Sequence, residues 1–310
     1  MLPILKESAS DPTEVFDPWS GAIVTTWDEL HERISTILTV HGDVPLVWRG
    51  VSDARWGLYS SLYRRLKKTK AKVQESDMVA AEVHLLKRAR SEWRFDEMSS
   101  LEILAHVQHY GGATRLLDVT ENPLIASWFA VEELFNDDGQ ATPDVDSRVY
   151  CFYVGDYIGL DEWGGRSLRW HDWGERQDRL ENDWGTGAAR RVWRPPAYNQ
   201  RISAQNGGFI LDGVPFSYPG ANKFHKAPGD FNSRWKIGEV RDAGSIPFRL
   251  NDPARAKQTA GSTPAFTFRI AAEARRPIRD RLQINYGYSA ASLYSDLFGL
   301  AQYSDPGLPQ

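Results

Sequence analysis

One stretch of the chain constrains the fold more than any other, because it places an apolar strand directly before an apolar helix. Residues 114–119 predict a buried strand, preceded by the chain-breaking pair Gly111-Gly112. Asn122 then supplies a helix N-cap and Pro123 suits the first helical position. Apolar residues continue at helical spacing to residue 131. Both elements therefore have to be buried against other parts of the protein.

The remaining elements follow from shorter signals. Capping boxes at residues 26–29 and 99–102 begin helices that end near residues 41 and 110. Further strands are predicted at 45–48, 148–154, 208–212 and 265–270, a long connection at 241–263, and helices at 277–284 and 289–302. Because strands and helices mix without strict alternation, we predict an α+β fold of central mixed or antiparallel sheets with flanking helices.

The chain shows no internal repeat and no linker that would divide it. We therefore predict one domain over residues 25–303, preceded by an irregular lead-in over 1–24 and followed by a tail over 304–310. Within it, residues 161–194 contain five Trp, seven Arg and seven acidic residues without a clean period. We interpret this segment as an ordered insertion held by Trp–Arg stacking and ion pairs.

Composition excludes several protein classes. The net charge of −4 argues against a basic nucleic-acid-binding coat, although residues 62–94 hold ten Lys or Arg against four acidic residues. That stretch is either a solvated helix face or a phosphate-binding surface. No apolar run would span a membrane, and no secretory signal is evident. The single cysteine, Cys151, fits a buried strand and a reducing compartment, so we expect a cytoplasmic protein.

Several motifs resemble a known family. An aromatic-Arg-Gly tripeptide follows the first strand, and His-Tyr-Gly precedes a Thr-Arg-Leu-Leu-Asp strand and an Asn-Pro-led helix that ends in Phe-Ala. The matching residues are Trp48-Arg49-Gly50, His109 to Gly111, Thr114 to Asp118, Asn122 to Ala130, Arg201 to Phe209 and Ser292 to Ala301. Together they resemble the FRG domain. The sequence departs from the family pattern at Gly112-Ala113 and at Val119.

The resemblance implies a function. FRG proteins look like parts of toxin–antitoxin and antiphage systems, and their order of motifs is loosely similar to that of ADP-ribosyltransferases. This implies an ADP-ribosyltransferase-like fold, NAD as a substrate, an RNA or protein acceptor and a possible antitoxin partner. The likeness is incomplete, because no Ser-x-Ser strand is evident. Gly207 also stands where a carboxylate would follow Gln205.

Under this hypothesis the expected site residues divide into two groups. The catalytic candidates are Arg49, His109, Tyr110, Asp118 and Gln205, and the NAD-binding candidates are Trp48, Arg49, Gly50, Tyr110, Thr114, Arg115 and Arg201. Arg49 would bind the pyrophosphate, with Gly50 allowing close approach. Tyr110 would stack on nicotinamide, and Asp118 would bind a ribose hydroxyl. Each also has a structural alternative, such as an ion pair, core packing or capping.

Other functions remain open. The seven histidines and Cys151 show no metal-ligand spacing, so no metal site is predicted. Walker, Rossmann and Gly-x-Ser-x-Gly motifs are also missing from the sequence. The alternatives to NAD chemistry are a non-enzymatic module that senses a phosphate or nucleotide ligand, and an RNA-cleaving toxin that uses His109 and Arg49.

Overall fold

The fold is described from a computed structural model of the chain. The description covers residues 12–20, 23–136, 139–153, 157–158, 191–195, 200–211, 226–227, 229–230, 232–236, 239, 242–244, 249–250, 264–297 and 299–300. Most of the Trp- and Arg-rich segment at 161–194, most of the connection at 241–263 and the tail at 304–310 lie outside these residues.

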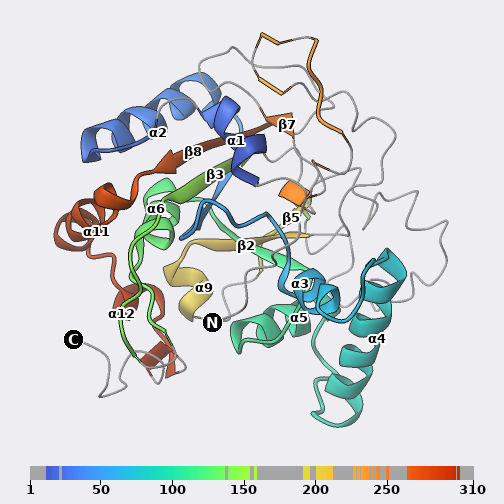
Figure 1. Ribbon diagram of the computed structural model, residues 1–310. Coiled ribbons are helices and arrows are strands. Elements are labelled where there is room, and N and C mark those ends of the chain that lie inside the picture. Colours follow the sequence, from blue (N-terminus) through green and yellow to red (C-terminus); the bar gives the residue numbers. More distant parts are fainter. Residues whose placement is uncertain are drawn as a thin grey trace.

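The centre of the protein is one eight-stranded sheet in the order β4-β5-β6-β2-β1-β3-β8-β7 (Figure 1). The strands are β1 (Leu46–Val51), β2 (Leu116–Thr120), β3 (Ser147–Tyr153), β4 (Tyr157–Ile158), β5 (Arg191–Trp193), β6 (Gly207–Leu211), β7 (Arg249–Leu250) and β8 (Pro264–Ile270). The six inner strands are antiparallel, and the outer pairs β4–β5 and β7–β8 are parallel. The prediction of central mixed or antiparallel strands with flanking helices is confirmed, and all eight strands belong to one sheet.

Helices surround this sheet. They are α1 (Pro12–Ser20), α2 (Trp27–His41), α3 (Ser61–Lys67), α4 (Glu75–Ser91), α5 (Ser100–His109), α6 (Pro123–Val131), α9 (Gln200–Ala204), α11 (Ala272–Tyr286) and α12 (Ala290–Leu293). Figure 1 shows α2, α6 and α11 together on one side of the strands, and α3, α4 and α5 grouped at the other end. The predicted caps at Thr26, Ser99 and Asn122 all accept hydrogen bonds from the first turns of their helices.

Alternation along the strands divides the core into two faces. On one face, Trp48 of β1 and Cys151 of β3 pack with buried residues of α2, α6 and α11. On the opposite face, Val47 of β1 and Leu117 of β2 pack with Phe16 of α1. The buried position predicted for Cys151 is confirmed.

Three sequence expectations need correction. The lead-in over residues 1–24 is not irregular throughout, because α1 forms there and its Asp17 pairs with the buried Arg148 of β3. The segment 161–194 is not wholly an insertion, since Arg191–Trp193 is strand β5 of the main sheet. The helix expected over 289–302 is interrupted, because α12 ends at Leu293.

Gly50 determines how closely α6 packs on the sheet. A Cβ atom at this position would overlap the main-chain oxygen of Ala126 and the main-chain nitrogen of Ala130, both in α6. We expected Gly50 to allow close approach of NAD to the backbone, but its surroundings indicate a role in helix packing instead. Its missing side chain lets the backbone of α6 lie directly against β1.

We predict that Gly50→Ala will destabilise the protein, because the new methyl group meets main-chain atoms that cannot rotate away. Overpacking of this kind costs about 1–3 kcal/mol or more. Gly207→Ala is the control, since its Cβ would lie 3.3 Å from the nearest atom, the oxygen of Ile202. Urea unfolding should show a clearly larger loss for Gly50→Ala, and equal losses would contradict this account of the α6 contact.

Candidate functional site

Strands β1 and β2 lie side by side but pair only briefly. Their register is limited to Trp48↔Thr120, whereas β1 and β3 pair along the whole length of β1. Next to that pair, the guanidinium of Arg49 donates to the main chain of β2, where a main-chain N–H of β1 would donate in a regular ladder. Its Nη1 donates a hydrogen bond of 2.6 Å to the main-chain oxygen of Asp118. The side chain of Arg49 thus bridges two neighbouring strands in the middle of the sheet.

Asp118 is unusually accessible for a residue in a central strand. Its side chain is 64% exposed, while the other four residues of β2 are buried. Its Oδ2 lies 3.8 Å from Nη1 of Arg49, and its Oδ1 accepts a 2.9 Å hydrogen bond from the amide of Gln108. The Gln108 oxygen in turn accepts from the hydroxyl of Thr114. Solvent therefore reaches the sheet at a carboxylate whose orientation is fixed from both sides.

A second guanidinium belongs to the same group. Arg64 on α3 is exposed, and its pKa is lowered by partial desolvation and by the nearby charge of Arg49, while Asp118 acts in the opposite direction. Two arginines therefore share the field of one carboxylate. Such an arrangement has a local excess of positive charge, which favours an anionic ligand. We define Arg49, Arg64, Gln108 and Asp118 as the arginine–aspartate site.

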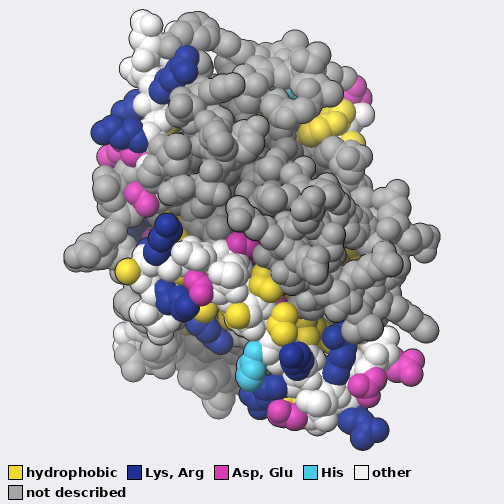
Figure 2. Space-filling model, turned by 90° about the vertical axis from the view of Figure 1, so that its right-hand side faces the viewer, with side chains coloured by type: hydrophobic (Ala, Val, Ile, Leu, Met, Phe, Trp, Pro, Cys, Tyr) yellow, Lys and Arg dark blue, Asp and Glu magenta, His cyan; other side chains and the backbone are white. Residues whose placement is uncertain are grey.

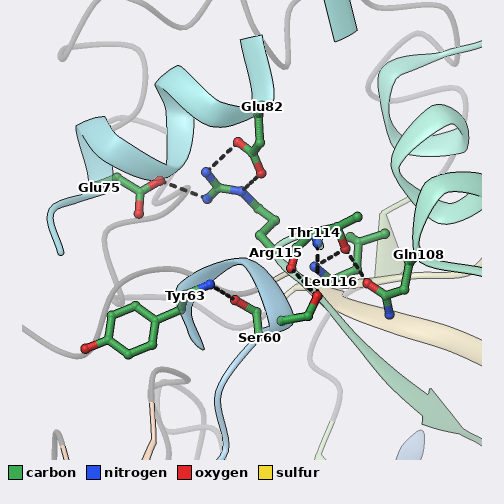
Figure 3. A network of polar contacts seen from close by, with 9 residues as sticks. Ser60, Tyr63, Glu75, Glu82, Gln108, Thr114, Arg115 and Leu116 are labelled. Atoms are coloured by element: carbon green, nitrogen blue, oxygen red, sulfur yellow. Dashed lines mark hydrogen bonds and ion pairs between the residues drawn. The ribbon is translucent and has the colours of Figure 1, made fainter. Parts of the chain in front are cut away.

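Arg115 does not take part in this site. Its guanidinium is buried and contacts both Glu75 and Glu82 of α4, as Figure 3 shows, with Nη1 lying 2.8 Å from Glu75. Although burial lowers the pKa of Arg115, the two carboxylates together raise it above its usual value. We therefore assign Arg115 to holding α4 against β2 and not to binding NAD.

Two other expected NAD-binding residues are also in the interior. The ring of Trp48 is fully buried in the core beneath α6, where no ligand can stack on it. Thr114 is buried as well, and its hydroxyl links the Leu116 amide to Gln108. Thr114 thus supports Gln108, which holds Asp118, so its contribution is to position the site.

His109 and Tyr110 point to different surroundings. The His109 side chain is buried, with Nε2 lying 2.6 Å from Oδ2 of Asp296. Burial lowers the pKa of His109, and this outweighs the opposing effect of Asp296. Tyr110, the next residue, is 64% exposed at the end of α5. The Tyr110 ring meets the His109 ring in a T-shaped contact with centroids 4.9 Å apart, and Tyr110 is largely exposed while His109 is engaged with the C-terminal segment.

The C-terminal segment forms a second polar cluster. Arg201 of α9 lies over the ring of Tyr294 at 4.3 Å, and the Tyr294 hydroxyl donates a 2.8 Å hydrogen bond to Glu132 at the end of α6. Gln205 donates from its amide to the main-chain oxygen of Leu293. Arg201 and Gln205, both expected in the NAD site, thus contact the C-terminal segment that also contacts His109.

Sequence reasoning missed two members of the arginine–aspartate site. Gln108 lies one residue before the His-Tyr-Gly motif, at the end of a helix where its side chain can reach the adjacent strand. Arg64 was counted only as part of the basic stretch. Both residues could have been recognised as polar side chains near an exposed position of β2. The exposure of Asp118, however, cannot be predicted from the sequence.

Comparison with known proteins places part of the chain in a family. Residues 44–139 match the family model of the FRG domain, so this segment is an FRG domain. The match includes β1, α3, α4, α5, β2 and α6, and with them every residue of the arginine–aspartate site. No curated protein and no solved structure gives a significant match. Among the described helices, none is long and apolar enough to cross a membrane.

We predict that Glu132→Gln will change the pH dependence of stability. Burial raises the pKa of Glu132 to about 7, although Tyr294, Arg201 and Arg275 act against this. The unfolded chain then loses this proton at a lower pH than the folded protein does, so the stability contributed by Glu132 falls as pH rises from about 4.5 to about 7. Urea midpoints should therefore decrease less between pH 5 and pH 8 in the variant. Parallel pH profiles of variant and wild type would contradict the assignment.

Proposed function

We propose that this FRG-domain protein binds NAD at the arginine–aspartate site and transfers ADP-ribose to a macromolecule, as a toxin or antiphage effector would. The observation that carries the proposal is the exposed Asp118 in a central strand, next to the guanidinium of Arg49. A carboxylate and two arginines in one accessible place match the two chemical needs of a dinucleotide. These are charge compensation for its phosphates and a polar partner for its ribose.

Arg49 and Arg64 fit the pyrophosphate. A guanidinium presents several N–H donors in a planar fork, so Arg49 can keep its bond to the Asp118 main chain and still donate to a phosphate oxygen. Arg49 is 21% exposed, which leaves part of its side chain open to a ligand. Arg64 adds a second charge from α3, and a phosphate between them would relieve their mutual repulsion.

Asp118 fits the reacting ribose. In ADP-ribosyl transfer, the bond between ribose C1′ and the nicotinamide nitrogen breaks, and nicotinamide leaves with the bonding electrons. An O–H or N–H group of the acceptor then bonds to C1′ and gives up its proton. Positive charge develops on the ribose during this exchange, and a fixed carboxylate stabilises it. Gln108 and Arg49 hold Asp118 in one orientation, as such a role requires.

Tyr110 offers an aromatic face for the nicotinamide. Its ring is exposed, and it is followed by Gly111 with φ +80°, a conformation that glycine adopts readily. Gly111 thus adds no side chain beside the ring, which contacts the ring of the preceding residue, His109. Stacking on such a ring would orient the nicotinamide for departure.

The RNA-cleaving alternative receives less support. It requires His109 and Arg49 to act together on one substrate. His109 is buried against Asp296, whereas Arg49 is bonded to Asp118. The sensing alternative uses the same arginines as the NAD hypothesis, and turnover of NAD distinguishes the two.

We predict that Arg49→Ala and Asp118→Asn will each reduce release of nicotinamide from NAD by about 100-fold or more, as removal of a fixed electrostatic partner does elsewhere. Asp118→Asn preserves the shape that Gln108 contacts and removes only the charge. Nicotinamide release is measured by chromatography, with thermal unfolding recorded for each variant. Arg276→Ala, an exposed arginine on α11, is the control.

Three outcomes would reject parts of the proposal. Full activity in either site variant would exclude that residue from the chemistry. Loss of folding in Arg49→Ala would indicate a structural role, in which case Asp118→Asn alone tests the site. Saturable binding of ADP-ribose by a wild-type protein that never releases nicotinamide would indicate a sensing module.

A further inference from the structure

The segment that carries Arg64 is the most basic part of the described chain. Between Asp53 and Glu75 there is no acidic residue, and six cations fall within nine positions, namely Arg64, Arg65, Lys67, Lys68, Lys70 and Lys72. The chain as a whole has a net charge of −4. This local excess of positive charge therefore needs an explanation beyond solubility.

Most of these cations are available to a partner. Arg64, Arg65, Lys68, Lys70 and Lys72 are exposed. Within the described residues, only Lys70 of the six lies within ion-pair distance of a carboxylate, that of Asp77 at 2.6 Å. Lys67 donates to the main-chain oxygen of Ala71. The side shown in Figure 2 carries Lys and Arg side chains in its lower part, toward α3 and α4, together with hydrophobic and acidic ones.

Aromatic rings accompany the charges. Tyr59 and Tyr63 are stacked, with ring centroids 5.2 Å apart and planes inclined by 22°. Trp56 is exposed three residues before Tyr59. Figure 3 shows the Tyr63 ring directed away from the Arg115 ion pairs. We call residues 56–72, with these rings and cations, the basic–aromatic segment.

This segment is fixed to the arginine–aspartate site. Ser60 caps α3 through the Tyr63 amide, and Ser61 exchanges hydrogen bonds with the main chain of Thr114, just before β2. Arg64 belongs both to the segment and to the site, since its charge interacts with Arg49 and Asp118. The hydrogen bonds from Ser61 to Thr114, from Thr114 to Gln108 and from Gln108 to Asp118 therefore connect the segment to the site.

We propose that the basic–aromatic segment binds a single-stranded nucleic acid, which is the ADP-ribose acceptor. The role of the nucleic acid as acceptor rests on the proposed function, whereas its binding to the segment does not. Phosphates pair with the exposed cations, and unpaired bases stack on accessible ring faces, which the exposed Trp56 offers and the half-buried Tyr59 and Tyr63 offer in part. In a duplex the base faces are stacked on one another and cannot contact aromatic rings. An acidic peptide could pair with the cations but has no bases to stack on the rings.

The test measures binding of a short fluorescent single-stranded RNA to the full-length protein by anisotropy, without NAD and at several salt concentrations. We expect the triple variant Arg65→Ala, Lys68→Ala, Lys72→Ala to bind at least about 10-fold more weakly. The slope of log affinity against log salt should also become shallower by about 2, as expected for three lost phosphate contacts. Arg33→Ala, Arg276→Ala, Arg281→Ala removes the same charge from α2 and α11 and is the control.

A second variant tests the stacking. Tyr63→Leu keeps an apolar side chain against the buried cluster of Leu62, Val73 and Met78 but removes the aromatic ring. We expect affinity to fall by about 5-fold or more, the usual loss when a stacked base loses its ring, with an unchanged salt slope. The proposal would be overturned if a duplex or polyglutamate displaced the labelled RNA as well as an unlabelled single strand does. It would also be overturned if the basic and control triple variants bound the RNA with equal affinity.

This binding measurement is separable from the NAD chemistry. Arg49→Ala should keep RNA affinity within about 3-fold, since one phosphate contact at most is lost. The basic triple variant should still release nicotinamide from NAD but should no longer label RNA. Failure of RNA binding with intact nicotinamide release would reject only the nucleic-acid inference. RNA binding without nicotinamide release would reject only the proposed enzyme.

Discussion

A buried cation governs the arrangement of the FRG segment. Arg115 enters the interior at the start of β2, where an unpaired guanidinium would be strongly unfavourable. Glu75 and Glu82, one helical face of α4, neutralise it, and this requirement fixes α4 against the sheet. Because α3 packs on α4 and bonds to Thr114 through Ser61, its position follows from the same contact. Arg115 therefore places Arg64 and the basic–aromatic segment without touching a ligand.

Much of the fold could be predicted from local sequence signals. Asn122-Pro123 gave the start of α6, and Ser99 with Glu102 gave the start of α5, because capping is decided by a few neighbouring residues. Strand positions followed from apolar runs. The pairing of α1 with β8 through Asp17 and Arg269, and the inclusion of β5 in the sheet, depend on contacts between distant residues, which periodicity cannot reveal.

The arrangement of the candidate site was predicted only in part, and its role in binding or catalysis stays a prediction. Arg49 and Asp118 were assigned to one site, and the two residues do contact each other. Residues from the same motifs separate because successive side chains face opposite sides of a strand and point in different directions around a helix. Trp48 enters the core while Arg49 reaches the gap between the strands, and Gln108 turns toward Asp118 while His109 turns toward Asp296. A motif identifies a segment, but burial and register decide which of its side chains a ligand can meet.

The central claim is that Arg49 of β1 and Arg64 of α3 bind the phosphates of a nucleotide beside the carboxylate of Asp118. Isothermal titration calorimetry of ADP-ribose with wild type and with Arg64→Ala tests it most directly, because Arg64 is exposed and makes no ion pair within the described residues that its loss would break. We expect saturable binding by the wild type and affinity lower by about 10-fold in the variant, the usual effect of one charge-assisted contact. Absence of binding by the wild type, or the same affinity for both proteins, would contradict the account.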